Sequence, residues 1–316
     1  MTENQKNQVQ WLTITQRNAG QRLDNFLLAT LKGVPKSHIY RIVRKGEVRV
    51  NKGRAKVHVK LQLNDLVRIP PIRTAEKMAI PKLHPEVKAR LTASILFENK
   101  HFLILNKPAG MAVHGGSGVS LGVIEAIRQI RPEAKEWELA HRLDKDTSGC
   151  LMIAKRRSGL RMLQALQREN KIQKTYLALL NGCWKQKKQQ VNAPLQKNQA
   201  QGGQRIVRID SQGQNAKTLF FNEQSFPDAT LVRARLVTGR THQIRVHSAS
   251  ILKHAILGDY KYGDENANKI FKKKGLNRMF LHAYQLKFAW ADTDEIISVN
   301  APLDRNLHTL LNNLKK

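Results

Sequence analysis

Residues 137–149 read WELAHRLDKDTSG, an alternating segment that runs into a turn. Apolar or ring-bearing side chains recur at every second position from Trp137 to Leu143, which predicts a β-strand over 137–144. The side chains of Arg142 and Asp144 then share the other face of this strand. An arginine beside an aspartate where a strand ends suits a functional site at a sheet edge or in a cleft. A structural ion pair beside a capped turn fits the same residues, so spacing alone leaves both interpretations open.

Two further segments carry unusual polar side chains. Residues 239–247, GRTHQIRVH, place two arginines, two histidines and a glutamine where a strand-like pattern becomes helix-like, with the helix expected over 246–252. A phosphate or carboxylate partner is the physical reason to gather arginines there. Residues 174–180, KTYLALL, predict a strand, and Tyr176 in such a strand is by itself more typical of a core residue than of a catalyst.

Metal and nucleotide cofactors are not expected. His242 and His247 are five residues apart, so a regular helix does not present them as a zinc-binding pair. Cys150 and Cys183 belong to no CxxC pair and form no disulfide framework, which indicates a reducing, cytoplasmic compartment. Residues 115–118 are glycine-rich, but no phosphate-binding GxxxxGK[ST] motif is present.

The charge of the chain points to a polyanionic partner. In 316 residues, 55 Lys and Arg face 24 Asp and Glu, which gives a net charge of +31. A hydrophobic fraction of 41% is ordinary for a folded protein, but self-repulsion at this charge disfavours a compact state without a counter-charge. No signal peptide and no stretch of about 20 apolar residues is visible, which favours nucleic acid over a membrane. Aromatic residues are only 6%, so we expect binding mainly through phosphate charge.

The pattern along the chain changes near residue 92 and divides it into two domains. Ten Lys and Arg and a single acid lie between residues 32 and 60, within a pattern of two short helices followed by short strands at 47–51, 57–63 and 65–70. The later part alternates strand-like segments (94–97, 102–107, 206–209, 217–222, 230–236) with helix-like ones (120–131, 158–169). We expect a flexible arm at 1–17, an RNA-binding domain at 18–80, a linker at 81–91 and a second domain at 92–316.

The basic block resembles a known RNA-binding module. The pattern RLDNFL followed by GEVRVN, within residues 18–70, is similar to the ribosomal protein S-four type (αL) RNA-binding domain. The resemblance implies that the basic helix face lies on structured RNA. The residues expected to make these contacts are Lys36, Arg41, Arg44 and Lys45.

Five motifs in the second domain resemble the RluA family of RNA pseudouridine synthases. They are NKPAGMAVHGG (106–116), HRLDKDTSG (141–149), KTYLALLNG (174–182), GRTHQIRVH (239–247) and LGDYKYG (257–263). With the preceding αL domain, the chain is most similar to RluC-type members, which act on large-subunit (23S) ribosomal RNA. The resemblance implies an α+β fold, in which the αL domain precedes a catalytic domain whose central mixed, largely antiparallel sheet is flanked by helices.

The resemblance also assigns roles to single residues. Asp144 matches the catalytic aspartate, Arg245 the arginine that pairs with it, and Tyr176 the tyrosine that stacks on the target base. Arg142 matches the arginine that props the gap left by a flipped nucleotide, and Ile244 matches a wall of the base pocket. Two further residues in the motifs, Arg240 and Lys107, are expected to contact substrate or RNA.

These residue types suit pseudouridine formation. A carboxylate is needed to trap or stabilise an electron-poor sugar or base, a cation to keep it ionised, and a flat side chain to hold the detached uracil. No cofactor is expected, and the expected substrate of this monomer is 23S rRNA, free or in an assembling large subunit. The modified uridines, the general base, and attack at C1′ or at C6 stay open.

Two other functions fit part of the pattern. A non-catalytic RNA-binding or ribosome-assembly protein would have the same charge, but would not need Asp144, Tyr176 and Arg245 together. A hydrolytic N-glycosidase or glycoside hydrolase usually uses two carboxylates, and Asp146 could be the second. Its place before Thr-Ser-Gly favours turn capping instead.

Overall fold

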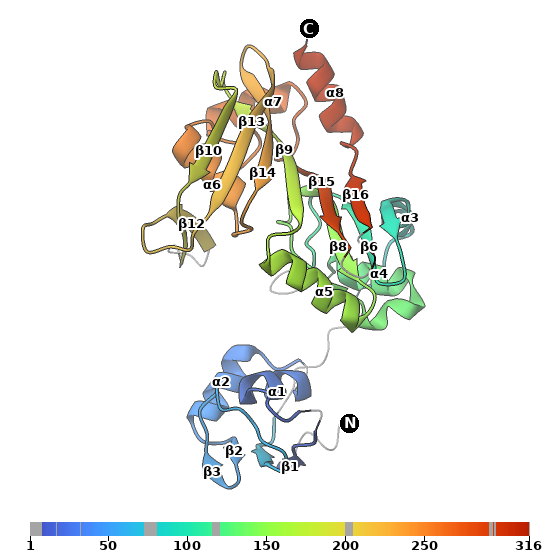
Figure 1. Ribbon diagram of the computed structural model, residues 1–316, viewed down its shortest axis with the longest axis vertical. Coiled ribbons are helices and arrows are strands. Elements are labelled where there is room, and N and C mark those ends of the chain that lie inside the picture. Colours follow the sequence, from blue (N-terminus) through green and yellow to red (C-terminus); the bar gives the residue numbers. More distant parts are fainter. Residues whose placement is uncertain are drawn as a thin grey trace. The chain divides into compact units, whose positions relative to one another are not determined.

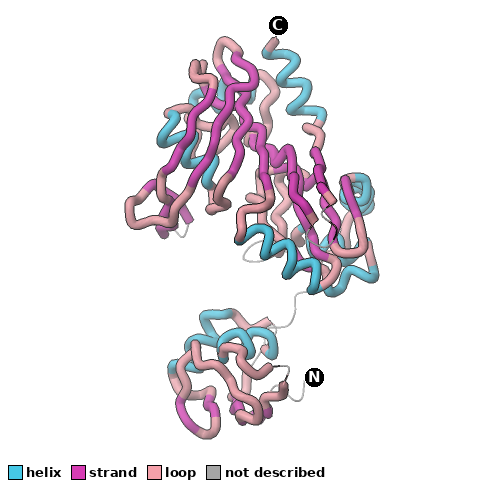
Figure 2. The backbone as a smooth tube through the Cα atoms, in the orientation of Figure 1, coloured by secondary structure: helices cyan, strands magenta, loops and turns pink. Residues whose placement is uncertain are grey.

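The chain folds into two units, residues 1–80 and 81–316, in the computed structural model (Figures 1 and 2). The residues it describes are 8–16, 18–31, 33–72, 81–115, 121–199, 205–290, 293 and 295–315. Parts of the predicted arm and of the glycine-rich loop at 115–118 lie outside the described residues.

The first unit packs two helices on a small antiparallel sheet. Helices α1 (Leu23–Thr30) and α2 (Lys36–Arg44) place their apolar stripes in one core. Along α2, Ile39, Ile42 and Val43 are buried, whereas Lys36, Arg41, Arg44 and the adjacent Lys45 are exposed. The sheet order is β1-β4-β2-β3, with strands Gln10–Thr13 (β1), Arg49–Val50 (β2), Gly53–Arg54 (β3) and Leu66–Ile69 (β4).

Two expectations for this unit were wrong. The arm predicted at 1–17 contains β1, which pairs with β4 because Leu12 packs against the core and Ile14 is fully buried in it. The strand predicted at 57–63 is absent from the described residues apart from one isolated bridge at Lys60. There the carbonyls of Val57 and Val59 accept hydrogen bonds from the N–H groups of Asp24 and Leu23, respectively. This segment therefore supplies acceptors for backbone N–H groups in the first turn of α1, which have no partner within the helix.

The second unit begins with a helix where a linker was predicted. Helix α3 spans Pro85–Ala93, with proline at its start, Glu86 in its first turn and Leu91 buried. Proline is common in linkers, but it is also favourable at the first position of a helix. The sequence around it therefore fits both structures.

In the described part of this unit, ten strands form one sheet of order β10-β13-β14-β9-β15-β8-β6-β5, with β16 and β7 pairing off this path onto β15 and β8. Every strand pair described in it is antiparallel except β15 with β8, so the predicted mixed, largely antiparallel sheet is confirmed. The strands at predicted positions are β5 Ile95–Glu98, β6 Phe102–Lys107, β9 Gln173–Asn181, β13 Lys217–Ser225 and β14 Ala229–Leu236.

The remaining strands complete this sheet and form a small separate one. The additional strands of the large sheet are β7 Glu138–Leu139, β8 Ser148–Ala154, β10 Lys188–Asn192, β15 Leu281–Ala289 and β16 Ile296–Asn300. Strands β11 (Leu195–Gln199) and β12 (Arg205–Ile209) form a separate pair, in which β12 includes the strand predicted at 206–209.

Helices cover both faces of the large sheet, as the alternation along β6 requires. Phe102 and Ile104 face a core shared with α5 (Arg157–Arg168), and Leu103 and Leu105 face a core shared with α4 (Val123–Ile130) (Figure 1). Helices α7 (Glu265–Lys273) and α8 (Arg305–Leu314) pack around Leu179 of β9. No helix among the described residues is long and apolar enough to cross a bilayer.

The helix predicted over 246–252 starts earlier and changes its geometry. Helix α6 comprises Gln243–His247, and a π-helical turn at Ser248–Leu252 continues it. His242, at the start of α6, has a left-handed backbone with φ 54°. The polar motif of residues 239–247 therefore lies partly on a helix and partly in the turn before it.

The strand predicted over 137–144 is much shorter. Strand β7 comprises only Glu138–Leu139, paired with β8. The Ala140 N–H still donates to the Met152 carbonyl, but the Met152 N–H donates to Nε2 of His141 at 3.1 Å. The His141 side chain thus accepts the hydrogen bond that a strand carbonyl would otherwise accept, and the ladder ends. Asp144 lies in a loop rather than on a strand face.

Candidate active site

The Asp144 loop is held in place by contacts at both ends. It leaves β7 and returns to the sheet at β8, where Gly149 lies opposite Ala283 in the parallel pair. Gly149 has φ +105°, and a Cβ there would lie 2.3 Å from the Ala283 carbonyl oxygen. In the loop itself, Leu143 is buried in the core, and the Lys145 carbonyl accepts the Gly110 N–H at 2.9 Å. The backbone around Asp144 is therefore fixed by packing and hydrogen bonds.

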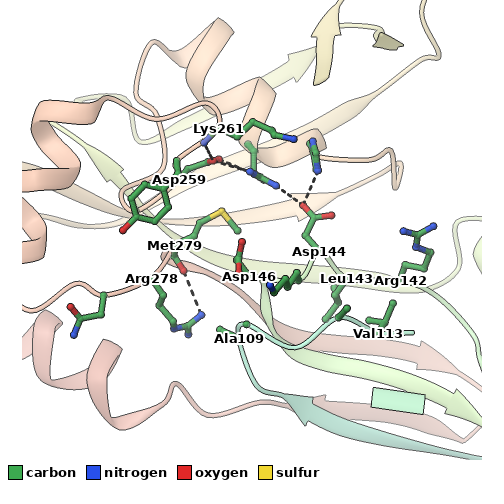
Figure 3. Close-up of a pocket in the computed structure, with 18 of the residues that line it drawn as sticks. Ala109, Val113, Arg142, Leu143, Asp144, Asp146, Asp259, Lys261, Arg278 and Met279 are labelled. Carbon is green, nitrogen blue, oxygen red and sulfur yellow. Dashed lines mark hydrogen bonds and ion pairs between the residues drawn. The ribbon is translucent and has the colours of Figure 1, made fainter. Parts of the chain in front are cut away.

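Arg245 binds two carboxylates at once. It lies in α6, and its Nη1 is 2.9 Å from Oδ2 of Asp144 (Figure 3). Its Nε and Nη2 donate to Oδ2 and Oδ1 of Asp259, both at 2.8 Å. Burial alone would lower the pKa of Arg245, but Asp259 and Asp144 outweigh it and raise the pKa above its usual range. The guanidinium is a permanent cation beside Asp144.

Asp259 was not singled out from the sequence, although it lies in the quoted LGDYKYG motif. Its side chain is 1% exposed. Besides Arg245, the N–H groups of Lys261 and Tyr262 donate to its Oδ1. Burial would raise the pKa of Asp259, but the bonds from Arg245 and these N–H groups lower it. Asp259 is thus an ionised anchor that orients Arg245.

His242 also approaches the carboxylate. Its Nε2 is 3.6 Å from Oδ2 of Asp144, and its Nδ1 is 2.7 Å from the Tyr262 hydroxyl. Burial lowers the pKa of His242, which favours the neutral ring near pH 7. The Arg245 guanidinium lies 5.1 Å from the centroid of the Tyr262 ring, so His242, Tyr262 and Arg245 brace one another.

Two cavities meet at Asp144. The larger, about 770 Å³, is drawn in Figure 3, and the smaller is about 360 Å³. Tyr176 on β9 is buried and lines the smaller cavity, together with Ile244 and Leu281. Burial raises the pKa of Tyr176, so its phenol is neutral near pH 7. The residues lining both cavities are Arg142, Leu143, Asp144, His242 and Arg245.

The comparisons with known proteins agree with this architecture. Residues 101–250 match the RNA pseudouridylate synthase family, and residues 21–67 match the S4 domain. The chain is 52% identical over 311 residues to the ribosomal large subunit pseudouridine synthase C of Pasteurella multocida (strain Pm70), covering 98% of this chain and 94% of that protein. It is 51% identical over 310 residues to the protein of the same name from Escherichia coli (strain K12), with 97% of each covered.

The chain belongs to the RNA pseudouridylate synthase family. Two solved human members share its fold. Human RNA pseudouridylate synthase domain containing 4 is 27% identical with a TM-score of 0.60, covering 73% of this chain and 96% of that one. Human RNA pseudouridylate synthase domain containing 1 is 25% identical with a TM-score of 0.58, covering 74% and 98%. The resemblance stated from the motifs is confirmed.

In this pseudouridylate synthase, the structure brings most of the predicted site residues together. Asp144, Tyr176, Arg245, Arg142 and Ile244 line the smaller cavity. Arg240 lines it as well, and its Nε donates to the Asn215 carbonyl at 3.1 Å. The four α2-side residues Lys36, Arg41, Arg44 and Lys45 lie in the first unit and are exposed.

The structure contradicts the prediction that Lys107 contacts substrate or RNA. Its side chain is fully buried, and its Nζ donates to the carbonyls of Pro108, Met111 and Lys145 at 2.8–3.0 Å. Burial lowers its pKa to about 7. Lys107 instead joins the turn after β6 to the loop that carries Asp144, a role that a basic residue in a motif does not reveal.

The histidines and cysteines of the described part do not assemble into a metal centre. There, no group of three His, Cys, Asp or Glu side chains could hold an ion. Cys150 is buried in the core and Cys183 is exposed.

Proposed function

We propose that this chain converts uridine to pseudouridine in large-subunit ribosomal RNA, with Asp144 as the catalytic carboxylate. Family membership and the names of the relatives support the reaction and the substrate. One observation carries the assignment of the residue. Asp144 lines both cavities and is paired with Arg245, whose orientation is fixed by hydrogen bonds to the buried carboxylate of Asp259.

The reaction rearranges atoms that uridine already contains. The C1′–N1 bond breaks and leaves its electron pair on the uracil, the ring turns, and a C1′–C5 bond forms. C5 then loses its proton, and N1 carries a proton in the product, so composition and oxidation state are unchanged. The stoichiometry requires no co-reactant, and the protein must supply charge, orientation and proton transfer.

Each chemical need has a matching side chain. Asp144, paired with Arg245, acts at C1′ or C6 of the flipped nucleotide. Tyr176 offers a flat face in the smaller cavity for the turning ring. Arg142 is exposed where the two cavities meet, which suits the gap left when a base leaves the stack.

We further infer that residues 18–80 form the RNA-binding domain and that α2 lies on RNA through Lys36, Arg41, Arg44 and Lys45. These side chains are exposed on the face opposite the apolar stripe of the helix. They supply binding and orientation without reading sequence. The substrate is 23S rRNA, free or in an assembling large subunit, and the enzyme acts in the cytoplasm as a monomer.

A hydrolytic N-glycosidase is less well supported, because it needs a second carboxylate in a separate role. Asp259 is occupied by Arg245 through both oxygens. Asp146 lines the larger cavity but not the smaller one beside Tyr176.

The test is to incubate the full chain with unmodified 23S rRNA transcript and to analyse the digested nucleosides by chromatography with mass detection. Pseudouridine at discrete positions, with no free uracil, is the expected result. Free uracil would identify an N-glycosidase, and unchanged RNA that is nevertheless bound would identify a non-catalytic binder.

A further inference from the structure

Lys174 places a half-buried ammonium group in the smaller cavity. It lies two residues before Tyr176 on β9, so both side chains project from the same face of the strand. Both line the cavity that Asp144 also lines. In the sheet, Lys174 pairs with Leu236 of β14 and Leu286 of β15, so apolar residues flank its backbone.

The position of this ammonium group is fixed by one neutral partner. Nζ of Lys174 donates to Oε1 of Gln167 on α5 at 3.0 Å. The amide of Gln167 is itself oriented, because its Nε2 donates to the Ala140 carbonyl at 2.9 Å. The ammonium group is therefore held between α5 and the segment that leads to the Asp144 loop.

Lys174 lacks a counter-charge. Among the described residues, no carboxylate lies within ion-pair distance of its Nζ. The neighbouring His141 ring is neutral near pH 7, because burial lowers its pKa to about 3. Burial also lowers the pKa of Lys174, to about 8. An ammonium group withdrawn from water without an anion is unfavourable unless a bound ligand supplies the charge. It has three donors, and within the described residues only one is used.

We propose that Lys174 is a catalytic residue that donates a hydrogen bond to a carbonyl oxygen of the flipped uracil and stabilises the negative charge that develops there. This inference rests on the proposed function. If Asp144 acts at C1′, the broken C1′–N1 bond leaves its electron pair on the uracil, spread over N1, O2 and O4. If it adds at C6, the π electrons of the C5=C6 double bond move toward O4. In both routes O4 becomes more negative than in bound uridine, so a hydrogen bond from Lys174 to O4 strengthens in the transition state.

The experiment compares Lys174→Met, Lys174→Arg and the matched control Lys171→Met in single-turnover and steady-state assays on 23S rRNA transcript. Lys171 is three residues away, exposed, and paired with Glu169 at the surface, so its variant removes the same charge outside the cavity. Lys174→Met is expected to lower kcat about 100-fold with KM for RNA within about threefold of wild type. Lys174→Arg is expected to retain kcat within about tenfold, and Lys171→Met to be unchanged.

A pH profile separates a catalytic from a structural role and covers the case in which the methionine variant does not fold. Because Lys174 has a pKa near 8, wild-type kcat/KM is expected to show a fall between pH 7 and 9, as its ammonium loses a proton, that Lys174→Arg lacks. The lowered pKa values of His141 and His242 and the raised pKa of Tyr176 lie outside this window. Lys107, whose pKa is about 7, titrates at the lower edge of the window in both enzymes, so the difference between the two profiles reports on Lys174. The titratable or charged side chains lining the cavity with Lys174 are His141, Arg142, Asp144, Tyr176, Lys197, Arg240, His242 and Arg245.

The outcomes distinguish this proposal from the proposed function. If wild type forms no pseudouridine, the proposed function fails. If wild type is active and a folded Lys174→Met variant keeps kcat within threefold, or if Lys174→Arg shows the same alkaline loss as wild type, the role of Lys174 is refuted and the function stands.

Discussion

At the scale of single residues, a buried carboxylate completes the candidate site. With a single hydrogen bond to a carboxylate, the Arg245 guanidinium could rotate. The two hydrogen bonds from Nε and Nη2 to Asp259 fix its orientation and leave Nη1 directed at Asp144. The pairing of Asp144 with Arg245 was predicted from the family motifs. Asp259 was missed because an aspartate in a glycine-rich turn is usually a turn residue, and its burial shows only in the folded chain.

Asp259→Asn is expected to lower kcat about 100-fold and to leave the Kd for RNA within about twofold, because it loosens Arg245 without removing an exposed charge. Breaking a buried ion pair should also lower the free energy of unfolding by about 3 kcal/mol. Turnover assays and urea denaturation measure these effects. Asp228→Asn is the control, since Asp228 is an exposed acid paired with Lys274 at the surface. A folded Asp259→Asn enzyme with wild-type kcat would show that Asp259 does not position Arg245.

At the scale of elements, the hydrophobic periodicity predicted the helices and strands whose apolar residues repeat regularly. Strand β6 and helix α5 follow their apolar patterns, and their predicted bounds agree with the structure to within one residue. The segment over 137–144 has an equally clear alternation, but the His141 side chain ends its ladder after Leu139. A local pattern contains no information about a distant hydrogen-bond partner, so this loop could not be predicted as one.

The junction of β8 and β15 holds the loop next to it. Gly149→Ala places a methyl group 2.3 Å from the Ala283 carbonyl oxygen at a φ of +105°, so one strand must shift. We expect a loss of about 2–4 kcal/mol in the free energy of unfolding, and a lower kcat in the folded fraction. Urea denaturation measures the first effect, with Gly239→Ala as the control, because a Cβ there meets no atom within 4 Å. Equal unfolding midpoints for the two variants would show that the close approach is not required.

At the scale of the whole molecule, the charge of +31 is divided between two tasks. We propose that the exposed basic side chains of α2 and Lys45 serve phosphate binding, whereas Arg245, with a side chain only 11% exposed between two carboxylates, serves the chemistry. Composition and periodicity were enough to predict the polyanionic partner and the basic helix. The family motifs placed Lys107 among the substrate or RNA contacts, because a motif does not separate an exposed lysine from a buried one.

Replacing Lys36, Arg41, Arg44 and Lys45 together by alanine is expected to weaken rRNA binding at least about tenfold at about 150 mM salt. The slope of log K against log[salt] should become shallower by about one for each phosphate that the variant no longer binds. Filter binding over a salt series measures both quantities. The charge-matched control replaces Lys269, Lys272, Lys273 and Lys274, on and after α7. If both quadruple variants change affinity and slope equally, the α2 surface has no particular role in RNA binding.

The most direct test of the account is pseudouridine formation by Asp144→Asn on 23S rRNA, measured together with its affinity for the same RNA. The amide keeps the size of the side chain but cannot act as a carboxylate toward C1′ or C6. The expected result is no detectable pseudouridine in single-turnover assays, with a Kd for RNA within about twofold of wild type. Wild-type turnover by this variant would contradict the assignment of Asp144 as the catalytic residue.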